Sequence, residues 1–324
     1  MRLATFIVDR RERLGVVDSE GRLVIDLVAA EKSAARREKR PVATCFSDML
    51  ALLEAGSRGM AAARRTARTT WKRLGMGAMA DGKMVFEVRR VKLAAPVPRP
   101  RKVFCLAGNY RDHIEEGGDK FQVQDAQTPR VFMKPPSTTV IGSNDAIRIP
   151  PVARAIDWEG ELAVVIGRRA KGVTARQALR YVAGYTVMND VSERKLQIRK
   201  RTKSRPKDEW FDWLNGKWLD TFAPQGPWIV TADEIRNPQT LEITTRVNGK
   251  SKQHNSTAQM LYPVAETIAY IAKIITLEPG DLISTGTVSG VGAASGTFMK
   301  GGDRVEVEIS GIGVLRNRVS ASRR

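Results

Sequence analysis

The chain contains little cysteine and no long apolar run. Its two cysteines, Cys45 and Cys105, fall on either side of a predicted domain boundary, so no structural disulfide is expected and a reducing compartment fits. No apolar stretch is long enough to cross a membrane, and the apolar run after Met1 is too short for a signal peptide. We therefore expect a cytoplasmic protein that does not bind membranes.

Acidic residues are scarce relative to basic ones. The chain has 54 lysines and arginines against 35 aspartates and glutamates, which gives a formal net charge of +19. Such an excess favours binding to nucleic acid, because counterions released from the phosphates drive the association. The basic residues are scattered over the whole chain, however, without a known binding motif or aromatic residues for base stacking. A nucleic-acid-binding protein is thus the alternative of another class, and we do not expect nucleic acid as a partner.

The densest basic run extends from Arg194 to Lys207, with eight lysines and arginines and no acidic residue. Like charges at this density repel one another, which predicts a segment that is mobile until an anion neutralises it. The same charges would attract an anionic substrate.

The length and composition permit two domains. At 324 residues, of which 42% are hydrophobic, the chain can bury two separate cores. Three prolines in Leu93-Ala-Ala-Pro-Val-Pro-Arg-Pro-Arg forbid a helix and predict an extended linker at residues 96–101. We expect a small N-terminal α+β domain, residues 1–95, and a larger catalytic domain, residues 102–324.

Short strands dominate the predicted secondary structure. Strands are expected near residues 3–8, 13–17 and 22–27, and helices between residues 51 and 73. The strand-like runs of the larger domain are 130–133, 146–149, 162–166, 186–188, 228–230, 242–247, 281–284 and 304–309. A capping box at Thr174 and the spacing of apolar residues from Thr257 to Lys273 predict two helices. The predicted fold class is therefore α+β, mostly β.

Three acidic residues stand at the ends of strand-like runs. Glu159 and Glu161 are two residues apart, so a strand would place both carboxylates on one face, and Asp190 ends the run from Tyr185. A carboxylate that enters a buried strand needs solvent, a cationic partner or a metal ion. Oxygen ligands without a nearby thiolate suit Mg²⁺ or Mn²⁺ rather than zinc. Acids on the wet face of an edge strand have the same spacing, so the pattern alone leaves both interpretations open.

One of the two histidines has a carboxylate at helical spacing. A strand-like run from Lys102 ends at Gly108, and the polar segment after it contains His113 and Glu116. If the segment from Asp112 is helical, the two side chains are neighbours. Glu116 could then orient the imidazole as a general base. A solvated surface pair is the alternative.

Four motifs occur in the order found in one protein family. They are Asn109-Tyr-Arg-Asp-His, Asp157-Trp-Glu-Gly-Glu-Leu-Ala-Val-Val-Ile-Gly, Gly184-Tyr-Thr-Val-Met-Asn-Asp and Gly280-Asp-Leu-Ile-Ser-Thr-Gly-Thr. From about Lys102 to Arg318 the chain therefore resembles the fumarylacetoacetate hydrolase family, and most of all its acylpyruvate hydrolase and oxaloacetate decarboxylase branch. This resemblance implies a twisted mixed β-sheet roll for the catalytic domain, and a homodimer.

The resemblance also implies roles for single residues. It implies that three carboxylates bind a divalent ion, that a histidine–glutamate pair activates water, and that a lysine meets the negative charge developing on a small anionic 2-oxo acid. The implied ligands of Mg²⁺ or Mn²⁺ are Glu159, Glu161 and Asp190. The implied catalytic residues are His113, Glu116 and Lys217, and the implied substrate-binding residues are Arg194, Gln197 and Thr287. Two positions depart from the family pattern, with Lys195 where many relatives have an acid and Val288 where they often have proline.

The reaction that the resemblance implies first is hydrolysis of the carbon–carbon bond of an acylpyruvate, through an enolate stabilised by the metal ion. Decarboxylation of oxaloacetate would use the same enolate. So would isomerisation or hydration of 2-hydroxyhepta-2,4-diene-1,7-dioate in aromatic catabolism, and the sequence leaves these outcomes open. A non-catalytic dimer is a further alternative.

Overall fold

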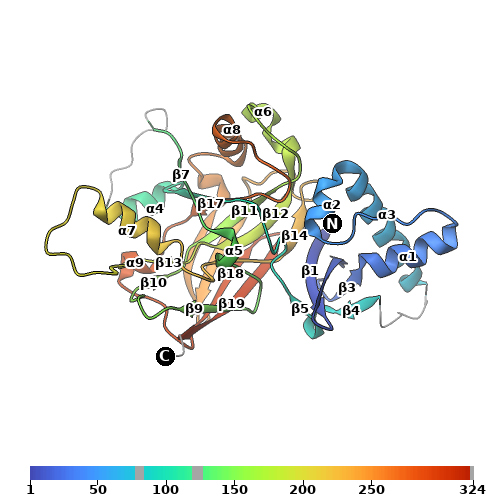
Figure 1. Ribbon diagram of the computed structural model, residues 1–324, viewed down its shortest axis with the longest axis horizontal. Helices are drawn as coiled ribbons and strands as arrows, with labels where there is room; N and C mark the ends of the chain where they lie inside the picture. Colours follow the sequence, from blue (N-terminus) through green and yellow to red (C-terminus); the bar gives the residue numbers. More distant parts are fainter. Residues whose placement is uncertain (77–83, 119–126, 322–324) are drawn as a thin grey trace.

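The computed structural model describes residues 1–76, 84–118 and 127–321 (Figure 1). The strands are β1 (Arg2–Val8), β2 (Arg11–Val17), β3 (Leu23–Asp26), β4 (Val85–Glu87), β5 (Lys92–Leu93), β6 (Val103–Ala107), β7 (Arg130–Met133), β8 (Val140–Ile141), β9 (Ala146–Ile149), β10 (Ile156–Asp157), β11 (Gly160–Ile166), β12 (Val182–Asn189), β13 (Ser192–Glu193), β14 (Ala223–Thr231), β15 (Glu242–Val247), β16 (Lys250–Ser256), β17 (Leu282–Thr287), β18 (Arg304–Ile309) and β19 (Gly313–Ala321). The helices are α1 (Leu27–Glu38), α2 (Met49–Glu54), α3 (Gly56–Gly75), α4 (Arg111–Glu116), α5 (Pro136–Thr139), α6 (Ala175–Ala178), α7 (Asp208–Gly216), α8 (Val264–Ile274) and α9 (Gly292–Ser295). The predicted α+β, mostly β class is confirmed.

Most strands belong to two mixed sheets. In the larger sheet the order is β4-β3-β2-β1-β14-β12-β11-β17-β6-β7, and the neighbours along this path are antiparallel except β17 and β6. The second sheet has the order β16-β15-β18-β19-β9, in which β19 and β9 run parallel. This is the mixed-sheet arrangement that the resemblance implied.

Strand β11 at the centre of the larger sheet is buried along its whole length. Leu162, Val164 and Ile166 pack into a core that also contains residues of β15, β18 and α8. Ala163 and Val165 point to the opposite face, where they pack in a second core with residues of α2 and α3. A strand buried on both faces reads as a continuous apolar run, and this run places the two glutamates at its head inside the protein.

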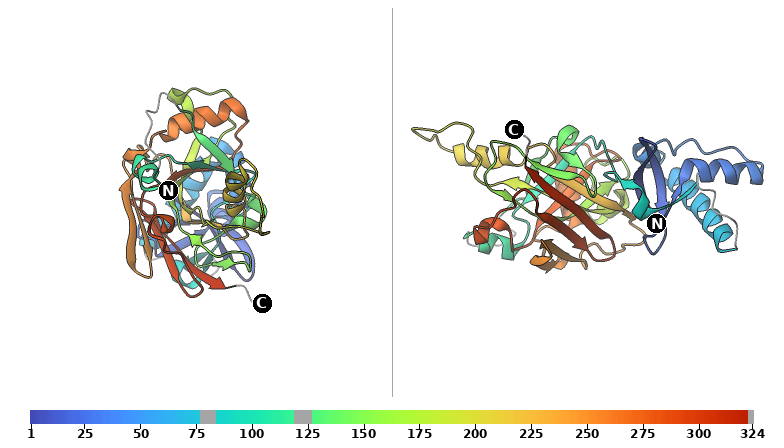
Figure 2. Two further views of the ribbon diagram at one scale, coloured as in Figure 1. Left: turned by 90° about the vertical axis from the view of Figure 1, so that its left-hand side faces the viewer. Right: turned by 90° about the horizontal axis from the view of Figure 1, so that it is seen from below.

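The N-terminal strands extend the large sheet. Leu3 in β1 lies opposite Ile229 in β14, and Thr5 Oγ1 donates to the carbonyl of Pro96 at 2.8 Å. Val97 is completely buried, so the proline-rich segment is packed as well as extended. The N-terminal strands and helices, in blue, lie at one end of an elongated molecule (Figures 1 and 2). The division of the chain at residues 96–101 stays a prediction, since one sheet continues across it.

The helices differ from the sequence interpretation in two ways. The helix predicted from Thr257 was wrong at its start, because Thr257–Gln259 forms a 3₁₀ turn and α8 begins only after Pro263. Proline disfavours the helical conformation in the residue before it. Helix α1 had not been predicted, although Asp26 caps it by accepting from the amide of Ala29 at 3.0 Å. None of the described helices is long and apolar enough to cross a membrane.

A buried carboxylate joins α1 to α3 in the N-terminal part. Glu31 is fully buried and accepts from Arg40 Nη1 at 2.5 Å, from Thr66 Oγ1 at 2.6 Å and from the amide of Ala43 at 2.9 Å. Burial alone would raise the pKa of Glu31, but these hydrogen bonds outweigh it and lower the pKa to about 2. The charged carboxylate therefore stabilises this packing.

We expect Glu31→Gln to lower the free energy of unfolding at pH 7 by about 1–3 kcal/mol, since hydrogen bonds to a charged group are lost in a buried place. The folded-state pKa is depressed, so the contribution is complete above the ordinary glutamate value of 4.5 and is lost as the pH falls toward about 2. Urea unfolding of both proteins at pH 7 and pH 3 measures the difference, which should shrink at pH 3. Glu38→Gln, at a more exposed partner of Arg40, is the control and should cost about 0–1 kcal/mol. A difference between Glu31→Gln and the unsubstituted protein that does not change with pH would contradict the assignment.

Candidate active site

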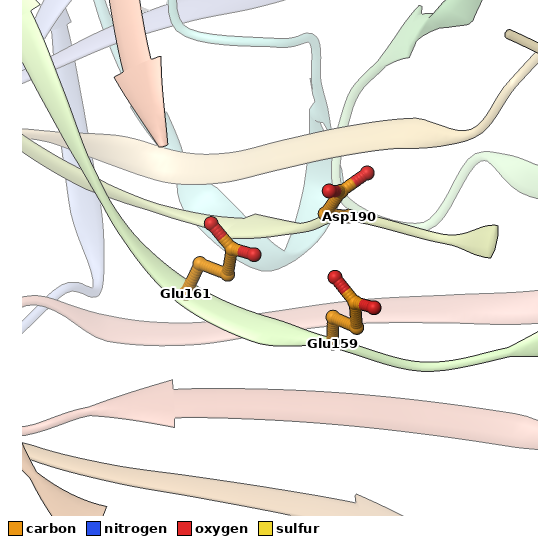
Figure 3. Close-up of side chains that lie close together, drawn as sticks. All are labelled: Glu159, Glu161 and Asp190. Atoms are coloured by element: carbon orange, nitrogen blue, oxygen red, sulfur yellow. The ribbon is translucent and has the colours of Figure 1, made fainter. Parts of the chain in front are cut away.

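Three buried carboxylates meet at the ends of two paired strands (Figure 3). Glu161 lies in β11, Glu159 directly precedes that strand, and Asp190 directly follows β12. Because Gly160 pairs with Asn189, the antiparallel register brings the three side chains together. One oxygen atom from each carboxylate lies within 4.8 Å of the others.

Three cationic side chains compensate part of this negative charge. Lys217, next to the end of α7, places its Nζ 2.8 Å from Glu159 Oε2 and 2.9 Å from Asp190 Oδ2. Lys134, just after β7, donates to Asp190 Oδ1 at 2.5 Å, and Arg194 donates to Glu159. Burial raises the pKa of Glu159, but Lys217 and Arg194 outweigh it and hold the pKa far below the ordinary value.

Glu161 is less well compensated than its two neighbours. Its Oε2 accepts from Ser284 Oγ at 2.6 Å and from the amide of Gly286 at 2.8 Å, whereas Oε1 is buried without a hydrogen-bond partner among the described residues. Burial, together with the charges of Asp190 and Glu159, raises the pKa of Glu161 well above its ordinary value. A divalent cation fits this place, because hard oxygen ligands and an unsatisfied carboxylate oxygen are what Mg²⁺ or Mn²⁺ requires.

The predicted histidine–glutamate pair forms on α4. His113 Nδ1 lies 2.8 Å from Glu116 Oε1, and Glu116 Oε2 accepts from the amide of Gly290 at 2.7 Å. Asp112, at the start of the same helix, accepts from Ser289 Oγ at 2.6 Å. These contacts fasten α4 to the turn after β17 and fix the ring of His113. Among the described residues none forms a hydrogen bond with its Nε2 atom, so this atom can exchange a proton with a ligand.

A cavity of about 580 Å³ connects the two groups. Its lining includes His113, Glu159, Arg194, Lys217 and Thr287, which were all predicted as site residues. Its apolar wall comes from α4, β7 and α7, by Ile114, Val131, Phe132, Trp210 and Trp213. The volume lies in the range of small-molecule binding sites.

The predicted substrate-binding residues occupy different surroundings. Arg194 Nε donates to Asp157 Oδ2 at 2.8 Å, so its guanidinium is held between Asp157 and Glu159. Thr287 Oγ1 donates to the carbonyl of Gly160 at 3.0 Å and accepts from Gln253 Nε2 at 2.8 Å. Gln197 is exposed and does not line this cavity. The contacts of these residues with substrate stay predictions.

The basic run is neutralised in part by acids that lie outside it. Arg201 forms two hydrogen bonds with Asp212 of α7, at 2.5 and 2.6 Å. Arg205 Nη2 lies 3.1 Å from Asp208 at the start of the same helix. Lys195, the departure from the family pattern, places its ammonium 5.5 Å from the ring centre of Phe298. The self-repulsion of the basic run is therefore weaker than the sequence predicted, because acids of α7 neutralise part of its charge.

Two residues of the site had not been identified from the sequence. Lys134 is completely buried against Asp190, and the signal for it was its place directly after a predicted strand. Asp157 holds Arg194 and also accepts from the amide of Gly292 at 2.6 Å. Asp157 stands two residues before Glu159. The spacing of two that placed Glu159 and Glu161 on one face of a strand therefore also applies to Asp157, and it could have identified this residue.

The sequence matches the family description "Fumarylacetoacetate (FAA) hydrolase C-terminal" over residues 102–320, more than half of the chain. The chain belongs to the fumarylacetoacetate hydrolase family. It is accordingly an enzyme.

Relatives in this family share most of the chain. Oxaloacetate tautomerase YisK of Bacillus subtilis is 34% identical over 323 residues, which are 98% of this chain and 100% of the relative. The mitochondrial oxaloacetate tautomerase Fahd2a of Rattus norvegicus is 38% identical over 273 residues, 84% of this chain and 79% of the relative. The crystal structure of maleylpyruvate hydrolase from Sphingobium sp. SYK-6, in complex with a manganese(II) ion and pyruvate, has a TM-score of 0.71 at 26% identity, with 100% of both chains covered.

We predict that Glu161→Gln weakens Mn²⁺ binding by at least ~10-fold, as expected for removal of a ligand or of its support. The amide oxygen can still accept from Ser284 and Gly286, so the fold should be kept. Removal of one like charge should leave the metal-free variant at least as stable as the metal-free parent. Calorimetric titration of chelator-stripped protein with MnCl₂ measures the affinity. The control is Glu308→Gln, at an exposed acid of β18 that pairs with Arg246, and an equal loss in this control would refute the site.

Proposed function

We propose that this enzyme catalyses the metal-dependent enolisation of a small 2-oxo acid, with keto–enol tautomerisation of oxaloacetate as the leading reaction. The observation that carries this proposal is the shared cavity, which joins a cation-seeking carboxylate cluster to an oriented histidine. The names of the relatives from Bacillus subtilis and Rattus norvegicus support the choice of oxaloacetate.

Glu159, Glu161 and Asp190 would hold the divalent ion. Bound there, the ion supplies electrophilic stabilisation of negative charge on the 2-oxo oxygen. Lys217 and Arg194 add positive charge at the same end of the cavity, which favours the carboxylate end of the substrate. Because both cations are largely withdrawn from water, their attraction for an anion is stronger than at an exposed surface.

The proton transfer falls to His113. Glu116 engages Nδ1, which fixes the ring tautomer and leaves Nε2 to take a proton from the carbon beside the 2-oxo group. The protonated imidazole or solvent then delivers a proton to the 2-oxo oxygen, which gives the enol, and in the reverse direction the imidazolium protonates the carbon. Tautomerisation needs no other reactant, since it only moves a proton between carbon and oxygen.

Hydrolysis of an acylpyruvate is the second candidate, and it was the first expectation from the sequence. His113 is about one-fifth exposed, so water can reach it in the cavity. An imidazole held in this way can activate that water against the distal carbonyl of an acylpyruvate. Oxaloacetate decarboxylation and the isomerase or hydratase reactions begin from the same enolate.

Replacement of the base and of its orienting carboxylate should have overlapping effects. We expect His113→Ala and Glu116→Gln each to lower kcat for enolisation by ~10²–10⁴-fold, and the double variant to lose little more than His113→Ala alone, because the two residues act as a unit. The rate is followed through the ultraviolet absorbance of the oxaloacetate enol, after subtraction of the uncatalysed rate. Acylpyruvate cleavage, followed by release of pyruvate, is measured on the same proteins.

His254→Ala is the matched control, because this second histidine lies on β16 and contacts Thr244 at 3.0 Å, and it is absent from the cavity lining. Its kcat should stay within about twofold of the unsubstituted enzyme. Strictly additive losses in the double variant, or full turnover after exhaustive chelation, would argue against the proposed mechanism.

A homodimer and a cytoplasmic location are also proposed, the first from the family resemblance and the second from the sequence alone. We expect light scattering at micromolar protein concentration to give the mass of two chains. A stable monomer at that concentration would refute the dimer.

A further inference from the structure

Arg130 is a cation of the cavity that the mechanism above does not use. It is the first residue of β7, it is exposed, and it lines the cavity together with Arg194 and Lys217. The latter two bind the carboxylates of the site. Within residues 1–76, 84–118 and 127–321, by contrast, no carboxylate pairs with Arg130. Its charge is available to a ligand.

The alternation of β7 places Arg130 in line with the metal cluster. Residues 130, 132 and 134 project from the same face of an extended chain, and the pairing with β6 continues to Lys134, whose amide donates to Val103 at 3.0 Å. At the inner end Lys134 donates to Asp190, and in the middle Phe132 lies under Lys217, with 5.3 Å between the Nζ atom and the ring centre. Arg130 therefore marks the outer end of this row.

The length of the row can be derived from strand geometry. At ~3.3 Å per residue, the Cα atoms of Arg130 and Lys134 are about 13 Å apart. An arginine side chain reaches back over part of this distance, and a carbon chain several atoms long spans the rest. The wall between the two ends is apolar, with Phe132, Trp210 and Trp213. A cavity of about 580 Å³ also exceeds what a four-carbon acid would fill.

We propose that Arg130 is a specificity-determining residue that binds a second carboxylate at the far end of the substrate. A 2-oxo dicarboxylate in which several carbons separate the two acid groups would then bind more tightly than the monocarboxylate of the same length, whereas oxaloacetate is too short to reach Arg130 and would be held at the metal cluster alone. The orientation, with the 2-oxo end at Glu159, Glu161 and Asp190, rests on the proposed function. Arginine suits the distal role because its planar guanidinium can form two parallel hydrogen bonds to a carboxylate.

A pair of ligands that differ only at the far end tests this proposal. In 2-oxoadipate the sixth carbon is a carboxylate, whereas in 2-oxohexanoate it is a methyl group. Calorimetric titration in the presence of Mg²⁺ gives the dissociation constant of each ligand without any need for turnover. The proteins are the unsubstituted enzyme, Arg130→Gln, Arg130→Lys and the control Arg304→Gln, which removes an exposed arginine from the first position of β18, away from the cavity lining.

We expect the unsubstituted enzyme to bind 2-oxoadipate more tightly than 2-oxohexanoate. Arg130→Gln should weaken the binding of 2-oxoadipate by ~10–100-fold, in the range for a charge-assisted hydrogen bond. Its dissociation constant for 2-oxohexanoate should stay within about twofold of the unsubstituted enzyme. Arg130→Lys should restore part of the preference, because a charge returns without the forked geometry. Arg304→Gln should change the affinity for neither ligand. This control separates a local contact of Arg130 from the general positive charge of the protein.

Three results would overturn the proposal: no preference of the unsubstituted enzyme for 2-oxoadipate, an equal loss for both ligands in Arg130→Gln, or an unchanged affinity for 2-oxoadipate in that variant. The same titrations on His113→Ala separate this proposal from the proposed function. If the enzyme fails to enolise 2-oxo acids but Arg130 still selects the dicarboxylate, only the proposed function falls. If enolisation proceeds and the selection is absent, only the role of Arg130 falls.

Discussion

The structure depends on holding three carboxyl groups close together inside a protein interior. Removal of Glu159, Glu161 and Asp190 from water costs several kcal/mol per ion, and only close cations and hydrogen bonds offset such a cost. Each partner comes from a different part of the chain: Lys134 follows β7 and Lys217 follows α7. The sheet order β12-β11-β17-β6-β7 is thus also the framework that holds the charges in place.

The incomplete compensation of Glu161 links this framework to function. Lys217 and Lys134 bind Asp190, and Lys217 and Arg194 bind Glu159, but Glu161 keeps one buried oxygen without a partner in the described part of the chain. A cluster that was only structural would gain stability from a further cation at that place. A carboxylate that binds a divalent ion, in contrast, must keep one oxygen atom that is not engaged by other donors. The turn at Gly286, with φ of +88°, supplies an amide to the other oxygen and so keeps the carboxylate aimed.

Part of the large positive charge serves the connection between the N-terminal and catalytic parts. Arg64 of α3 pairs with Asp233 at 2.6 Å, and Arg101 pairs with Glu54 of α2 at 2.7 Å. Exposed pairs of this kind contribute little stability each, but they orient the two parts, whose strands β1 and β14 already share one sheet. Around the cavity, positive charge surrounds the place where we propose that an anionic substrate binds.

The sequence by itself determined the α+β class, most strands of the catalytic part and the family, because alternating apolar residues and ordered motifs are local properties of the chain. It also identified the pairs Glu159–Glu161 and His113–Glu116, because a spacing of two or three residues already fixes which side chains are neighbours in a strand or a helix. Asp190 was identified from its place at the end of a strand-like run and from the family resemblance. Only the tertiary structure decided that Lys134 and Asp157 belong to the site, that acids of α7 neutralise part of the basic run, and that Arg130 stays without a carboxylate partner among the described residues. These facts depend on contacts between segments far apart in the sequence, and such contacts are set by strand order and packing, which no local spacing encodes.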